Sequence, residues 1–81
     1  MANNTNPRPL WAIAREVRKD WTKPYFGAVP YLDAMSCLDS IEDTYICDSA
    51  KSIVLRFLSN ASTWRGETAK RVKAELKAMC K

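Results

Sequence analysis

Apolar side chains return every three or four positions in four separate stretches of this 81-residue chain. That interval places them on one face of an α-helix, whereas a half-buried strand would require strict alternation. The four predicted helices span residues 9–21, 30–38, 49–61 and 66–80. Residues 49–61 carry the clearest apolar stripe, so we expect them to form the central, most buried helix. The pattern therefore predicts an all-α fold, a compact bundle of about four short helices in a single domain.

The predicted inward faces of the four helices consist mainly of aliphatic side chains that can share one core. These positions are Leu10, Ile13, Ala14, Val17, Trp21, Tyr31, Ala34, Met35, Leu38, Ala50, Ile53, Val54, Phe57, Leu58, Ala61, Ala69, Val72, Leu76 and Met79. Large apolar residues outside the helices are expected to anchor the connections to this core. Tyr25 and Phe26 would do so before the second helix, and Tyr45 and Ile46 before the third.

Capping and turn residues indicate where the helices begin. Asp48 is the predicted N-cap of the third helix, and Ser62 or Thr63 is a candidate cap for the fourth. Gly66 is either a tight joint between these helices or a weak point in one longer helix. Leu55 falls opposite the apolar stripe of the third helix, so it is either exposed or part of an interface. Neither an Asn-Gly nor an Asp-Gly pair occurs, so the usual hairpin signal is missing.

Length and hydropathy bound the domain organisation. Residues 1–8 are polar and proline-containing, which predicts a flexible N-terminal arm, and residues 9–81 form the helical domain. A chain this short buries only a little over half of its unfolded surface, so its margin of stability is small. No apolar run approaches the roughly 18 residues of a membrane span, and the N-terminus lacks an apolar segment of the signal-peptide type. We therefore expect a cytoplasmic location.

Charge is unevenly distributed along the chain. Residues 1–23, 24–50 and 51–81 carry net charges of +3, −5 and +6, which give the overall +4. Two interpretations are open: the basic helices pack beside the acidic segment and neutralise it, or a basic face remains for an anionic partner. Glu67 precedes Arg71 by four residues, the favourable order on a helix, and this favours neutralisation.

The residue types argue against catalysis. Histidine is absent, which excludes Ser–His and Cys–His nucleophilic sites, and no glycine-rich phosphate loop occurs. Cys37, Cys47 and Cys80 lack the spacing of a zinc site, and a Cys37–Cys47 disulfide would need an oxidising environment. The acidic residues of 39–48 do not follow the calcium-loop spacing and are predicted to form a solvated connection. We therefore expect a non-enzyme with no catalytic residues, no metal site and no cofactor.

Tryptophan and arginine dominate the energetics of protein interfaces, and five such residues are candidates for partner binding. Trp11, Arg15 and Arg18 lie on a face of the first helix away from its apolar stripe, and Trp64 and Arg65 precede the fourth helix. The alternative for both tryptophans is packing, with Trp11 covering the edge of the core and Trp64 closing its end.

An alternative site for nucleic acid lies on the fourth helix. Lys70, Lys73 and Lys77 are spaced to form a basic stripe, and Arg65 directly precedes this helix. Binding through these residues would be weak, nonspecific and strongly salt-dependent. The acidic segment 24–50 could also dock onto the basic ends of another copy, which would give a homodimer.

Three strings carry a family resemblance: "PYFGAVPYLDAM", "DSAKSIVLRFLSNASTWRG" and "AKRVKAELK". They resemble a family of small proteins encoded in phages and prophages, and the similarity spans residues 9–81. The family has no assigned activity, so the resemblance assigns no catalytic or binding residue. Its pattern leads us to expect glycine or another flexible residue near Ile46 and Cys47, where this chain departs from it.

The resemblance implies action inside a bacterial host cell. Small non-enzymatic phage proteins often bind and block a host factor, including defence nucleases, or assist phage DNA metabolism. We therefore predict a small phage-type binding protein that acts stoichiometrically on a host protein or protein–nucleic-acid complex. An inhibitor of a bacterial defence system is the most concrete version, and nonspecific nucleic-acid binding through the basic C-terminal helix is the alternative.

Overall fold

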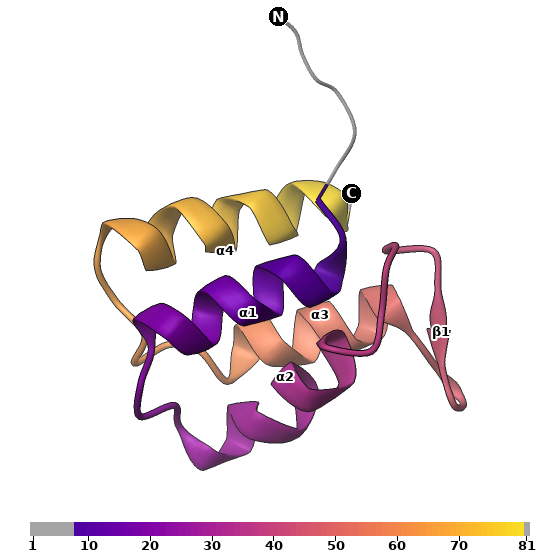
Figure 1. Cartoon of the computed structure of the whole chain (residues 1–81), viewed down its shortest axis with the longest axis horizontal. Helices are drawn as coiled ribbons and strands as arrows, with labels where there is room; N and C mark the ends of the chain where they lie inside the picture. The colour runs from indigo at the N-terminus through magenta and orange to yellow at the C-terminus, as the bar shows by residue number, and fades with distance from the viewer. Residues whose placement is uncertain (1–7, 81) are drawn as a thin grey trace, which may run out of the picture.

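Four α-helices and one two-stranded sheet make up the fold, which a computed structural model describes over residues 8–80 (Figure 1). The helices are α1 (Leu10–Asp20), α2 (Val29–Met35), α3 (Ala50–Ser59) and α4 (Glu67–Met79), and a 3₁₀ turn, η1 (Phe26–Ala28), precedes α2. Consecutive helices run in opposite directions, and α1 and α3 each pack against both α2 and α4. The predicted compact, single-domain helical fold is therefore confirmed in outline. Within residues 8–80, no helix has the length and apolar character needed to cross a membrane.

One core fills the space between the helices, and the spacing of apolar residues predicted most of it. The confirmed members are Leu10, Ile13, Ala14, Val17, Ala34, Met35, Leu38, Ala50, Ile53, Val54, Phe57, Ala61, Ala69, Val72 and Leu76. Trp21, Tyr31, Leu58 and Met79 are half-buried and pack against its edge. Phe57, on α3, is the largest side chain that is fully buried in the part of the chain that the structure describes, which agrees with the predicted central place of this helix.

The inward face of α2 differs from the predicted one. Leu32 is fully buried, although the predicted stripe ran through Tyr31, which is only half-buried. The helix begins at Val29, with Pro30 in its first turn, and ends earlier than expected. Positions 31 and 32 are neighbours on the helix, and the packing of α2 against both α1 and α3 turns position 32 towards the core.

A hairpin replaces the solvated loop expected before α3, so the fold is not purely α. Strands β1 (Thr44–Tyr45) and β2 (Asp48–Ser49) pair antiparallel, and Tyr45 lies opposite Asp48. Ile46 begins the two-residue turn with a φ of 57°, where glycine is usually required. Such a conformation costs about 1–3 kcal/mol for a residue that is not glycine. The sequence did not predict this turn, because Ile46 and Cys47 are not the glycine, asparagine or aspartate residues that favour it.

Three of the four residues expected to anchor connections are exposed, so those predictions are wrong. Ile46 is 83% exposed, Phe26 79% and Tyr25 45%, and only Tyr45 packs against the core. Each misplaced residue lies in a tight turn, either next to η1 or at the tip of the hairpin. A tight turn constrains the direction of the backbone, and the side chains on the outside of the turn therefore point into solvent.

The helix starts also differ in detail from the expected caps. α3 begins at Ala50, one residue later than expected, so Ser49 caps it instead of Asp48, and the Ser49 Oγ accepts the Ser52 backbone N–H at 3.1 Å. Neither Ser62 nor Thr63 caps α4, because the chain is still turning there. Gly66 precedes α4 with a φ of 114°, which confirms that it is a tight joint between two helices.

Candidate interaction surfaces

A hollow of about 400 Å³ lies on the outer side of α1, next to the end of α2. Trp11, Arg15 and Arg18 of α1 line it together with Ser36, and we call these four residues the α1 surface. The first three were predicted from the sequence as partner-binding residues. They meet here because positions 11, 15 and 18 share one helical face that the core stripe does not use.

Each large side chain of the α1 surface is held by a specific contact. The Trp11 indole N–H donates to Asp39 Oδ1 at 2.8 Å, and the Arg15 guanidinium carbon lies 5.1 Å from the centre of the Trp11 ring. Arg18 forms an ion pair with Asp33 of α2. The indole remains 38% exposed. A fixed but accessible tryptophan loses little conformational freedom when a partner covers it.

Trp64 is not available to a partner, so its assignment to a binding site is wrong and the packing alternative is confirmed. The side chain is 2% exposed. Its ring stacks on Trp21, with centroids 5.8 Å apart and an angle of 11°, and lies 6.4 Å from the ring of Phe57. The indole N–H donates to Asp20 Oδ2 at 2.8 Å. Trp64 thereby ties the α3–α4 connection to the end of α1.

The predicted five-residue site is therefore split. Arg65 is exposed, but it follows Trp64, which binds Asp20 at the last residue of α1. Trp11 stands in the first turn of the same helix, roughly 14 Å away along its axis at 1.5 Å per residue. Arg65 thus belongs to the opposite end of α1 from the tryptophan it was grouped with.

Tyr25 and Phe26 form an exposed aromatic pair that the sequence pattern misplaced in the core. Their ring centroids lie 4.8 Å apart. Gly27 makes room for this arrangement, since a Cβ there would stand 2.6 Å from Tyr25 Cε2 and 2.8 Å from Asn60 Oδ1. The signal in the sequence was the two prolines, Pro24 and Pro30, which confine this segment to a short surface turn.

Carboxylates neutralise part of the positive charge by contacts between distant segments. Arg8 binds Glu75 through two hydrogen bonds of 2.7 and 3.0 Å and lies 2.8 Å from Glu16, which also pairs with Arg71. The expected Glu67 partner of Arg71 is thus replaced by a residue of α1. Residues 1–7 of the predicted flexible arm lie outside the described residues, and Arg8, its last residue, makes these contacts.

The Glu16 network predicts a pH dependence of stability. Hydrogen bonds from Arg71 and then Arg8 lower the pKa of Glu16. A carboxyl whose pKa is lower in the folded state stabilises the fold above its unfolded pKa, and this stabilisation is lost as the pH falls through the folded pKa. Urea unfolding should therefore show a free energy of unfolding that decreases between about pH 5 and pH 2.

The Glu16→Gln variant is expected to be less stable at neutral pH. Its free energy of unfolding should also fall less steeply as the pH is lowered, because its side chain cannot titrate. Glu42→Gln, at an exposed carboxyl in the connection before the hairpin, serves as the matched control and should keep the wild-type slope. A Glu16→Gln profile parallel to that of the wild type would contradict the assigned role of this network.

Nine cations lack a carboxylate partner within residues 8–80. Three of them, Arg15, Lys19 and Lys23, belong to α1 and the connection after it. The other six lie between α3 and the end of α4, and they are Lys51, Arg56, Arg65, Lys70, Lys73 and Lys77. The predicted basic stripe is incomplete, however, because Lys73 turns inward. Its Nζ donates to the Trp64 carbonyl oxygen at 2.6 Å and lies 5.9 Å from the ring centre, and burial lowers the pKa of the ammonium group. Lys70 and Lys77 are exposed.

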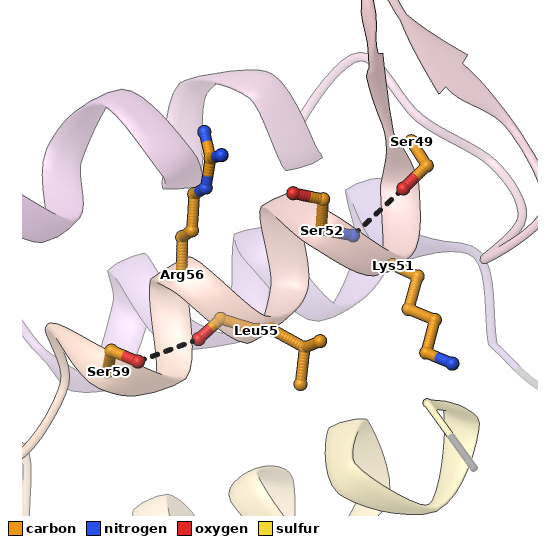
Figure 2. A pocket seen from close by; sticks show the side chains of 6 residues that line it. All are labelled: Ser49, Lys51, Ser52, Leu55, Arg56 and Ser59. Carbon is orange, nitrogen blue, oxygen red and sulfur yellow. Dashed lines mark hydrogen bonds between the residues drawn. The ribbon is translucent and has the colours of Figure 1, made fainter.

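A second hollow, of about 340 Å³, lies on the outer side of α3 (Figure 2). We call its lining the α3 surface, which comprises Ser49, Lys51, Ser52, Leu55, Arg56 and Ser59. Leu55 is 45% exposed, which confirms that it lies on the face of α3 opposite the core. Figure 2 shows Lys51 and Leu55 pointing to the α4 side of the helix and Arg56 pointing to the other side. The lining thus combines an apolar centre with two cations.

The cysteines and carboxylates form no evident metal centre in the described part of the chain. Cys37 and Cys47 are exposed free thiols, and Cys80 is half-buried, which raises the pKa of its thiol. Among residues 8–80, no three Cys, Asp or Glu side chains lie close enough together to hold a metal ion. Comparisons with known protein families, with curated protein sequences and with solved structures find no match to this chain.

Proposed function

We propose that this chain is a small binding protein that acts stoichiometrically on a partner protein or protein–nucleic-acid complex. The observation that carries the proposal is Trp11, an exposed indole fixed by Asp39 on one side and by Arg15 on the other. Tryptophan and arginine are the residue types that most often dominate interface energetics, and they do so most strongly where they are already ordered.

The exposed pair of Tyr25 and Phe26 supplies a second contact of the same kind. Phe26 leaves most of its ring in solvent, an arrangement that burial against a partner would relieve. The resemblance to phage-encoded proteins suggests a bacterial host factor as the partner, acting in the cytoplasm. Inhibition of a defence system is the most concrete form of this proposal, and it requires binding only, with no reaction.

Affinity capture from a bacterial host lysate tests the proposal, with and without nuclease treatment. We expect the wild-type chain to retain a partner protein in stoichiometric amount after nuclease treatment. Trp11→Ala should weaken the purified complex by about 30-fold or more, the effect typical of a central aromatic contact. Leu55→Ala, on the separate α3 surface, is the matched control and should bind the partner as the wild type does. Recovery of no protein, or equal binding by Trp11→Ala, would refute the proposal.

Direct nucleic-acid binding is a second candidate, favoured by the cations that lack carboxylate partners. Lys70 and Lys77 are exposed on α4, and Arg65 lies on the connection that precedes this helix. Such a group would attract a phosphate backbone without reading base sequence.

Fluorescence anisotropy with a labelled duplex tests this second candidate. Binding is expected at about 50 mM salt and should fade towards 200 mM, because each phosphate contact releases counterions. The double variant Lys70→Gln/Lys77→Gln should reduce the salt dependence. Lys73→Gln is its matched control and should change it less, since the Lys73 ammonium is already bonded to the Trp64 carbonyl. The absence of binding at low salt would exclude this function.

A further inference from the structure

The tip of the β1–β2 hairpin exposes an apolar side chain in an unfavourable backbone conformation. Ile46 is 83% exposed and has a φ of 57°, which is rare for a β-branched residue. Neither feature stabilises the isolated chain, because the side chain buries little surface and the backbone is strained. Contact with a second molecule would give this side chain the burial that it lacks within its own chain.

The segment that carries this apolar tip is acidic, and one of its carboxylates, Asp48, lies in the hairpin itself. Residues 24–50 contain five carboxylates and neither lysine nor arginine. Asp39, Glu42 and Asp48 are exposed, and Asp48 lies in β2 directly opposite Tyr45. The hairpin therefore presents a protruding apolar residue and one exposed carboxylate, that of Asp48. Figure 1 shows the hairpin at the edge of the molecule, beside the start of α3, where another molecule could reach it.

The α3 surface has the complementary features. Leu55 supplies an exposed apolar side chain, Lys51 points to the same side of α3, Arg56 points to the other side, and the remaining lining residues are serines. Serine side chains are short, so a protruding residue can approach the helix closely. None of the lining residues is acidic, and neither cation has a carboxylate partner in the described structure.

We propose that the α3 surface binds the β1–β2 hairpin of a second copy of this chain, so that the protein forms a symmetric dimer. Ile46 of each copy would pack on Leu55 of the other, with the Asp48 carboxylate of the hairpin near Lys51 and Arg56. The hairpin leads directly into α3, so a two-fold axis beside this junction gathers both reciprocal contacts in one patch. This proposal is independent of partner binding through the α1 surface.

Sedimentation velocity on the full chain tests the dimer at concentrations from about 10 μM to 1 mM, the range in which a weak complex forms. We expect the wild type to associate with increasing concentration and to dissociate as salt is raised, because opposite charges face each other. Ile46→Asn and Leu55→Asn should each weaken the association at least tenfold. Trp11→Ala is the control and should associate as the wild type does.

A mixing experiment separates the proposed geometry from nonspecific association. Ile46→Asn retains an intact α3 surface and Leu55→Asn retains an intact hairpin, so an equimolar mixture restores one of the two reciprocal contacts. The mixture should associate more strongly than either variant alone. Both positions are exposed, and asparagine tolerates a positive φ, so Ile46→Asn should also raise the midpoint of thermal unfolding. Three results would overturn the proposal. The wild type could remain a monomer at every concentration, either variant could associate as strongly as the wild type, or the mixture could associate no more strongly than each variant alone.

Discussion

Replacing Trp64 by alanine is expected to lower the free energy of unfolding by about 3–5 kcal/mol, the usual cost of removing a large buried aromatic side chain. Trp64 is almost fully buried, stacks on Trp21 and packs beside Phe57. Its removal would leave a cavity where α1, α3 and the connection to α4 meet. A domain of this size has a total stability of only about 3–5 kcal/mol, so the variant should be largely unfolded at 25 °C.

Circular dichroism during urea and thermal unfolding would measure this effect. Trp11→Ala is the matched control, because it removes the same side chain from an exposed position, and it should cost about 1 kcal/mol or less. Trp64→Phe should be intermediate, since it retains much of the packing but loses the indole hydrogen bond to Asp20. A Trp64→Ala variant as stable as Trp11→Ala would contradict the role assigned to this side chain.

Replacing Leu32 by alanine should lower the free energy of unfolding by about 2–5 kcal/mol, because the side chain is fully buried in the core. The range reflects how far the short helix α2 can move to fill the space. This variant distinguishes the observed orientation of α2 from the one expected from the sequence, in which Tyr31 faces the core and Leu32 does not.

Leu55→Ala is the matched control for Leu32→Ala, since it makes the same change on an exposed face of α3. We expect it to alter the free energy of unfolding by less than about 0.5 kcal/mol. Urea unfolding of both variants under one set of conditions gives the comparison. Equal losses at the two positions would mean that α2 is not oriented as described, with Leu32 facing the core.

The candidate interaction surfaces could be predicted only in part. The trio of Trp11, Arg15 and Arg18 was found because residues on one helical face can be identified from their spacing alone. Trp64 was grouped with them on its residue type, and the distant contact with Asp20 decided otherwise. The exposed Tyr25 and Phe26 were missed because a side chain in a turn has no periodicity that reveals which way it points.

The pairing of cations with carboxylates likewise depends on contacts between segments that are distant in the sequence. The sequence placed Glu67 four residues before Arg71, but the observed partner of Arg71 is Glu16, on another helix. Arg8 is likewise bound by residues of α1 and α4. Neutralisation therefore depends on how the helices pack, and within residues 8–80 it leaves the cations of α3 and most of those of α4 without a carboxylate partner.

By itself, the order of residues determined the helices and most of the core stripe, because each depends on neighbours within a few positions along the chain. Packing of the whole chain decided that Leu32 is buried, that Trp64 stacks on Trp21 and that Lys73 turns inward. Those outcomes depend on segments far apart in the sequence. The free energy of contacts between such segments outweighs the local conformational preference of a residue only once the helices have packed together.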